Sequence, residues 1–106
     1  MAPKRHTRPP RFDPIDPLLD GPAEATLDLH GCHGGEAEIL IRQFVRSSQR
    51  RHAGKIIHII TGKGRRSHSG PVLKPLLKRL LQTELSKLVT DYALDIDEAG
   101  YRIRLK

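Results

Sequence analysis

The sequence has few of the residues that would indicate covalent cross-links, aromatic platforms or membrane spans. Its 106 residues include one cysteine, no tryptophan, two phenylalanines and two tyrosines. A single cysteine cannot form an internal disulfide, and no segment approaches the ~18 consecutive apolar residues of a membrane span. The scarcity of aromatic residues argues against a base-stacking platform. The basic start of the chain lacks the apolar region of a secretory signal, so we expect a cytoplasmic protein with no membrane partner.

Carboxylates are missing from one long stretch of the chain. Residues 55–81 contain seven Lys or Arg and no Asp or Glu, whereas the rest of the chain is balanced, with 12 residues of each sign. The net charge of +7 therefore comes from this stretch alone. A surface that binds a polyanion suppresses acidic residues in this way. We predict nucleic acid as the partner; the alternative is a basic face exposed only to solvent.

The prolines divide the chain into two parts. Six of the eight lie within residues 1–25, where apolar side chains are scattered and regular secondary structure is not expected. We predict a Pro-rich basic arm over residues 1–23, partly disordered, and one folded domain over residues 24–106. Two alternatives remain for the arm: a plain linker, or a segment that lays Phe12, Ile15, Leu18 and Leu19 across the domain.

Hydrophobic periodicity predicts the elements of the domain. Residues 26–31 alternate as a half-buried strand, residues 36–52 follow a helical period up to Gly54, and residues 55–61 form a β-branched central strand. A second helix enters at residues 70–71, although Pro75 is expected to shift its regular start toward residue 74. Two strands near 88–94 and 101–105 follow. The order β-α-β-α-β-β predicts an α/β two-layer sandwich: a mixed four-stranded sheet with two helices mainly on one face.

The first candidate site is the pair Asp28 and His30 at the end of the first strand. Residues i and i+2 of a strand point to the same side, so the carboxylate could orient the imidazole as a general base or acid. The alternative is an ordinary hydrogen-bonded surface pair. Arg102 and Arg104 alternate with the apolar residues of the last strand and are candidates for the same face.

The second candidate site is the glycine-rich loop that begins at Gly62. Backbone N–H groups, a lysine and a helix terminus can together meet a phosphate there. The loop lacks the residues of a nucleotide P-loop and of a dinucleotide fingerprint, so no nucleotide cofactor is predicted. The nucleic-acid contacts expected in and around it are Thr61, Gly62, Lys63, Gly64, Arg65, Arg66 and Lys74.

We interpret the other potentially reactive side chains without a metal or cofactor role. His30, Cys32 and His33 form the one metal-compatible cluster, and the second pair of ligands that a structural zinc site needs is missing. We therefore expect no metal and no cofactor. His58 lies in an isoleucine run and is interpreted as a packed or hydrogen-bonded strand residue.

The chain resembles the small MutS-related (Smr) domain over about residues 24–106. Two motifs carry the resemblance, LDLHG at 27–31 and ITGKG at 60–64, together with the closing strand at 101–106. The resemblance implies a two-layer α/β sandwich similar to the C-terminal domain of a bacterial translation initiation factor. It also implies nucleic-acid binding and DNA-nicking or RNA-cleaving activity, in some members on messenger RNA at stalled or collided ribosomes.

The resemblance also implies roles for individual residues. It assigns the Asp-x-His of the family to Asp28 and His30, and the substrate loop of the family to Gly62, Lys63 and Gly64. The loop often begins with histidine, where this chain has Thr61.

We therefore predict a monomeric Smr endonuclease that acts on RNA or on structured or single-stranded DNA. The alternatives are a non-catalytic module that binds nucleic acid or the ribosome, and a protein-interaction domain. For RNA we predict metal-independent cleavage that leaves a 2′,3′-cyclic phosphate, because one acidic residue in the two motifs is too few for a two-metal site.

Overall fold

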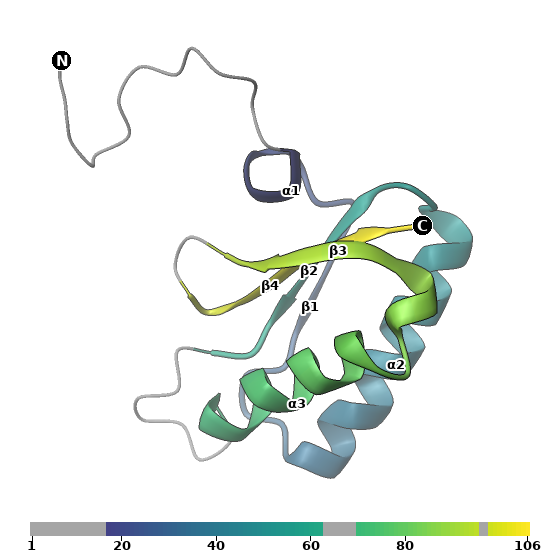
Figure 1. The fold of residues 1–106 in the computed structure, drawn as a ribbon. Coiled ribbons are helices and arrows are strands. Elements are labelled where there is room, and N and C mark those ends of the chain that lie inside the picture. Colours follow the sequence, from purple (N-terminus) through teal and green to yellow (C-terminus); the bar gives the residue numbers. More distant parts are fainter. Residues whose placement is uncertain (1–16, 63–69, 96–97) are drawn as a thin grey trace, which may run out of the picture.

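The computed structural model describes residues 17–62, 70–95 and 98–106 (Figure 1). The predicted element order is confirmed, with a short helix added before it and a 3-10 turn before the third strand. In chain order the elements are α1 (Pro17–Asp20), β1 (Ala25–Asp28), α2 (Gly34–Arg51), β2 (Ile56–Ile60), α3 (Gly70–Gln82), η1 (Ser86–Leu88), β3 (Val89–Leu94) and β4 (Gly100–Leu105).

The four strands form one mixed sheet in the order β1-β2-β4-β3. β1 and β2 are parallel, with Asp28 opposite Ile60, and α2 makes the crossover between them. β4 runs antiparallel to both of its neighbours, β2 and β3. The predicted α/β sandwich with a mixed sheet is therefore confirmed, and β2 and β4 hold the interior positions.

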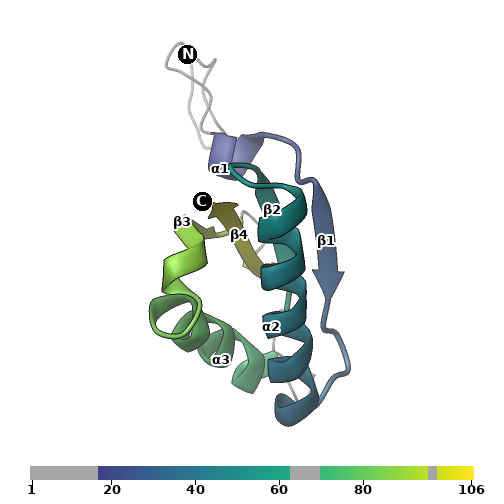
Figure 2. The ribbon, with the colours of Figure 1, turned by 90° about the vertical axis from the view of Figure 1, so that its right-hand side faces the viewer.

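The helices α2 and α3 cover one face of the sheet, as Figure 2 shows. Ile57, Ile59 and Ile103 point from the two interior strands into the space under the helices and are fully buried. The helical residues that meet them follow the predicted spacing and are Ala37, Ile41, Val45, Leu73, Leu77, Leu80 and Leu81. Among the described helices, none is long and apolar enough to cross a membrane.

Three boundaries differ from the sequence predictions by more than one residue. β1 ends at Asp28 rather than continuing to residue 31, because the chain turns at His30 and Gly31, where φ is +85°. α2 begins at Gly34, two residues before the predicted start. α3 begins at Gly70 in spite of Pro75; the N–H that Pro75 lacks would have reached a carbonyl in the first turn, so only one helical hydrogen bond is lost.

The expectation that residues 1–25 contain no regular structure was wrong for their last part. Pro17 is the first residue of α1, where a missing N–H costs nothing, and β1 already begins at Ala25. Leu18 is 6% exposed, and α1 contacts β3 and β4 on the face that α2 and α3 leave open. Leu18 thus lies across the domain, in agreement with one of the two alternatives for the arm. Phe12 and Ile15 belong to residues 1–16, which lie outside the described part.

Candidate functional site

The ends of β1 and β2 lie side by side and bring the two sequence motifs together. The register pairs Asp28 with Ile60, and the backbone N–H of Leu29 donates to the carbonyl of Ile60 at 2.8 Å. The turn with His30 and the residue Gly62 therefore follow neighbouring strands at the same edge. The carboxyl ends of parallel strands are where open α/β sheets place their ligands.

Asp28 shapes the turn that carries His30. Its Oδ1 accepts the backbone N–H of His30 at 2.9 Å, a contact typical of an Asx turn. Because β1 has ended, the strand alternation that was expected to put both side chains on one side no longer applies to His30. Within the described residues, no hydrogen bond joins the carboxylate to the imidazole. Asp28 therefore orients the backbone of the turn and not the imidazole of His30. The His30 side chain is exposed.

Thr61 and Gly62 are fastened to the β3–β4 hairpin. The carbonyl of Ala99 accepts the N–H of Thr61 at 2.8 Å, the N–H of Gly62 at 2.9 Å and the hydroxyl of Thr61 at 3.2 Å. Thr61 is 1% exposed, so its side chain supports the loop from inside the protein. The N–H of Gly62 is likewise engaged within the protein and is not free to meet a phosphate.

The hairpin that supplies Ala99 is itself tightly fixed. Asp95 is 8% exposed; its Oδ1 accepts the N–H of Ala99 at 2.8 Å and its Oδ2 lies 2.8 Å from Nε2 of His58. Gly100 approaches β2 so closely that a Cβ atom there would lie 2.0 Å from the carbonyl oxygen of Ile59. His58 is a hydrogen-bonded strand residue, as predicted. Asp95 was missed, because nothing in the local sequence links it to a histidine 37 positions away.

Arg102 and Arg104 lie on the open face but already have protein partners. The register pairs Gly100 with Ile60, so the two arginines are two and four residues, roughly 7 and 13 Å, further from the Asp28 end. Arg102 donates from Nε to the carbonyl of Leu18 at 2.6 Å and from Nη2 to that of Gly21. Arg104 pairs with Asp91 at 3.4 Å. The arginines share the open face with Asp28 but not with a strand position of His30, and they serve the packing of α1 and β3.

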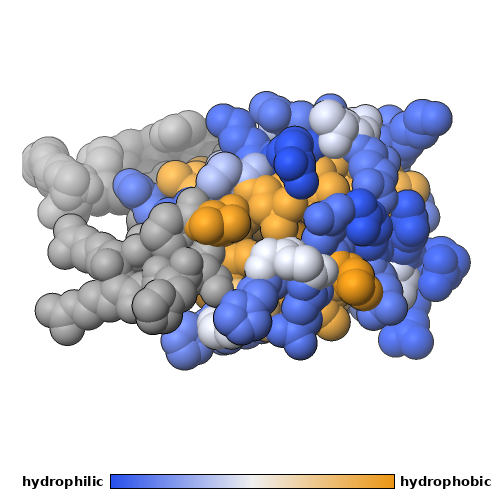
Figure 3. Space-filling view, turned by 90° about the horizontal axis from the view of Figure 1, so that it is seen from below, coloured by the Kyte–Doolittle hydropathy of each residue, from blue (hydrophilic) through white to orange (hydrophobic). Residues whose placement is uncertain are grey.

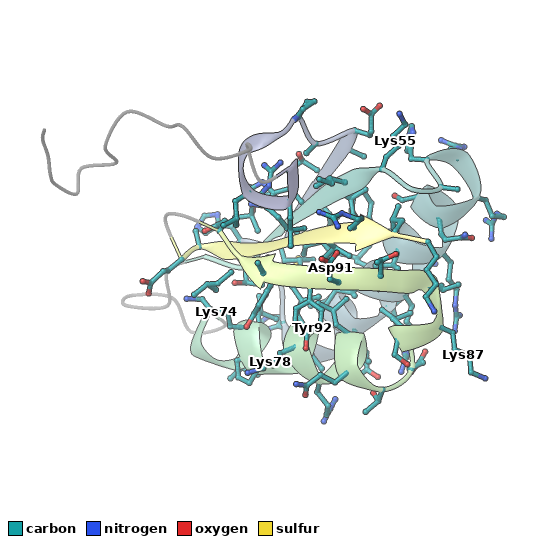
Figure 4. All side chains as sticks on the ribbon, turned by 45° about the horizontal axis from the view of Figure 1, so that its top comes forward. Lys55, Lys74, Lys78, Lys87, Asp91 and Tyr92 are labelled. Atoms are coloured by element: carbon teal, nitrogen blue, oxygen red, sulfur yellow. The ribbon has the colours of Figure 1, made fainter. Side chains whose placement is uncertain are left out.

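The cations of the basic stretch that the structure describes lie at separate places. Lys55 precedes β2, at the end of the sheet opposite Gly62, whereas Lys74 and Lys78 lie on α3 (Figure 4). Lys63, Gly64, Arg65 and Arg66 lie outside the described residues. Their predicted phosphate contacts stay predictions.

Cys32 lies beside the turn in surroundings that keep its thiol protonated. Desolvation raises the pKa of the thiol, and the nearby carboxylates of Glu36 and Asp28 raise it further. A thiolate nucleophile is therefore disfavoured here. Among the described residues, no group of three or more His, Cys, Asp or Glu side chains is placed to hold a metal ion.

The helix-covered side carries a shallow groove between α2 and α3. It encloses about 530 Å³ and is lined by Gly34 and Glu38 of α2 and by Val72, Pro75, Leu76 and Arg79 of α3. Figure 3 views this side and shows apolar surface among hydrophilic residues. The residues of α3 that line the groove identify the side of this helix that faces α2.

The comparison with known families bears on both motifs. A sequence model of the Smr domain matches residues 27–101, which include the Asp28 turn, the loop after β2, and β3 with the turn that leads into β4. Comparisons with curated proteins and with solved structures gave no match.

Proposed function

The chain belongs to the Smr domain family, and from that premise we propose that it binds nucleic acid and cleaves it as an endonuclease on RNA or on structured or single-stranded DNA. One observation supports the proposal most. The turn fixed by Asp28 presents an exposed imidazole, His30, beside the strand end that leads into the glycine-rich loop. The candidate proton-transfer group therefore lies at the same edge of the sheet as the strand end that leads into the candidate phosphate-binding loop.

On RNA, the imidazole of His30 takes the proton of a ribose 2′-hydroxyl. The 2′-oxygen forms a bond to the adjacent phosphorus while the bond from phosphorus to the 5′-oxygen breaks, and the leaving 5′-oxygen takes up a proton from water. The products are a 2′,3′-cyclic phosphate and a 5′-hydroxyl. Charge that develops on the phosphate oxygens is stabilised by the loop cations Lys63, Arg65 and Arg66. Asp28 acts as a positioning residue, because it holds the backbone of the histidine.

The test compares His30→Ala with His33→Ala. Both histidines are exposed, and His33 precedes α2 without a side-chain capping bond, so it is a matched control. We expect His30→Ala to cleave labelled RNA and DNA substrates roughly 10² times more slowly than the parent while still binding them. His33→Ala should behave as the parent. Binding without cleavage by the parent on every substrate would instead indicate a non-catalytic module.

End-group analysis tests the reaction type. RNA fragments produced in the presence of a chelator should carry a cyclic phosphate at the 3′ end and a hydroxyl at the 5′ end. A 3′-hydroxyl with a 5′-phosphate, or loss of cleavage in chelator, would refute the transesterification and leave the nuclease proposal standing.

A further inference from the structure

Tyr92 and Tyr101 form a partly buried aromatic pair that packs against the core near the β3 edge of the sheet. Their ring centroids are 5.7 Å apart and the rings meet edge to face at 73°. Both side chains lie on the helix side, since Tyr92 is opposite the buried Ile103 and Tyr101 is opposite the buried Ile59. In an edge-to-face pair, the ring that offers its edge keeps both of its faces free of the other ring. The small number of aromatic residues was the one reason to expect no base-stacking platform.

Two lysines of α3 lie on the flank next to this pair. Leu73, Leu77 and Leu80 bury one side of α3, and Leu76 and Arg79 line the groove with α2. Lys74 and Lys78 are one turn apart on the remaining side, away from α2. α2 packs near β1, at one edge of the sheet, and β3 forms the opposite edge. The flank of α3 that points away from α2 therefore faces β3. Figure 4 shows both lysines on the same side as Tyr92.

Among the described residues of α3 and β3, no carboxylate opposes these lysines. α3 contains no acidic residue. Asp91 of β3 and Asp95, which follows it, point to the other face of the sheet, toward Arg104 and His58, and Glu98 lies in the turn between β3 and β4. Glu84, which follows α3, is held by Arg42 and Arg46 of α2. The flank is therefore positively charged and joins directly to the start of α3, at the end of the glycine-rich loop.

We propose that Tyr92, Tyr101, Lys74 and Lys78 form a track for a single-stranded segment of polynucleotide that leaves the candidate site, with an unpaired base stacked on the solvent-accessible part of the tyrosine pair and phosphates on the lysines. This inference rests on the proposed function. Base stacking on an aromatic ring and phosphate contact with lysine are the two interactions that bind single strands without sequence preference. Leu94, 37% exposed on the same edge strand, extends the apolar part of the track.

A protein strand is the competing occupant of this edge, and the structure disfavours it. The register between β3 and β4 shifts between Val89 and Asp91, as a bulge at the start of this edge strand would shift it. Bulges of this kind reduce strand addition. The two lysines and the partly accessible tyrosine pair favour a polyanion with flat bases.

The experiment measures binding of labelled oligouridine, oligothymidine and a blunt RNA duplex in the His30→Ala background, so that cleavage does not consume the probe. We expect Tyr92→Leu to weaken oligouridine binding about tenfold and Tyr92→Phe to leave it within twofold, since phenylalanine keeps the ring. Lys74→Gln with Lys78→Gln should lower the salt slope of binding by about 1.4 units, or about 0.7 for each lost contact on a single strand. The control pair is Lys55→Gln with Lys87→Gln, which removes the same charge from the end of the sheet where β2 and β3 begin, opposite Gly62 (Figure 4).

A second measurement does not depend on substitutions. The chain has two tyrosines and no tryptophan, so its intrinsic fluorescence comes from Tyr92 and Tyr101 alone. Stacking of a base should quench this fluorescence when oligouridine or oligothymidine is added, and the duplex should quench it much less. Equal quenching by the duplex would overturn the single-strand track.

The outcomes separate the two proposals. If the parent and His30→Ala proteins bind no polynucleotide, the proposed function fails. If they bind, and the track variants match the Lys55 and Lys87 control, the track alone is refuted and the site at the ends of β1 and β2 stands.

Discussion

Oδ2 of Asp95 and Nε2 of His58 lie 2.8 Å apart and join the β3–β4 hairpin to the middle of β2. The other carboxylate oxygen of Asp95 accepts the N–H of Ala99, whose carbonyl in turn receives three donors from Thr61 and Gly62. A single buried carboxylate is therefore the common anchor of the hairpin and, through Ala99, of the residues that begin the glycine-rich loop.

Asp95→Ala should lower the free energy of unfolding by about 2 kcal/mol, because it leaves the Ala99 N–H and the His58 imidazole without their partner. Asp95→Asn keeps one acceptor oxygen and should cost less. Urea denaturation measures both, with the half-buried Asp91→Ala as the control. Equal stability of Asp95→Ala and Asp91→Ala would contradict the anchor role.

Asp28→Asn should retain most of the cleavage rate, whereas Asp28→Ala should lose roughly 10²-fold. Asparagine also forms Asx turns, so its oxygen can still accept the His30 N–H. Hydrogen exchange at the His30 amide provides the structural readout, with protection kept in Asp28→Asn and lost in Asp28→Ala. A rate for Asp28→Asn as low as that for Asp28→Ala would show that the negative charge, and not the turn, is what the reaction needs.

Arg102→Lys should release α1 from the open face of the sheet. The guanidinium reaches the carbonyls of Leu18 and Gly21 together, and a lysine ammonium lacks this planar fork. Limited proteolysis and hydrogen exchange over residues 17–24 should both accelerate. Arg104→Lys is the matched control, because Arg104 pairs with Asp91. Identical protection of residues 17–24 from protease and from hydrogen exchange in the two variants would show that Arg102 does not hold α1.

Glu84→Gln should destabilise the protein at neutral pH and have little effect in strongly acidic solution. Hydrogen bonding from Arg42, with the charges of Arg42 and Arg46, lowers the pKa of Glu84 below its ordinary value of 4.5. A lowered pKa stabilises the fold above the ordinary value, and that stabilisation is lost as the pH falls through the lowered one. Melting temperatures of parent and variant should differ by a few degrees at most and converge at low pH and high salt. A difference in melting temperature that grows on acidification would contradict the lowered pKa of Glu84.

Neutralising Lys63, Arg65 and Arg66 together should weaken binding to RNA and DNA and lower the salt slope by about 2 to 3 units. The control removes three exposed cations from the opposite end of the sheet, Arg50, Arg51 and Lys55. A salt slope equal to that of the control would disprove phosphate contact by the loop.

The sequence was sufficient for the element order and insufficient for the details of the site. Hydrophobic periodicity located both long helices and all four strands, because each buries one side against the same core. The end of β1 could not be read, since Leu29 and His30 continue the alternation after the strand has stopped. Likewise, the contact of Asp95 with His58 and the pairing of Tyr92 with Tyr101 are consequences of tertiary structure. Counting aromatics could not reveal that two of the four lie side by side.

The interior position of β4 also determines when the site can exist during synthesis. β3 joins the sheet only through β4, and Ala99, which holds Thr61 and Gly62, immediately precedes β4. A nascent chain that has emerged only as far as α3 therefore lacks the support of the glycine-rich loop, although both sequence motifs have already been translated. Assembly of the site must wait until residues Gly100–Leu105 have left the ribosome and inserted between β2 and β3.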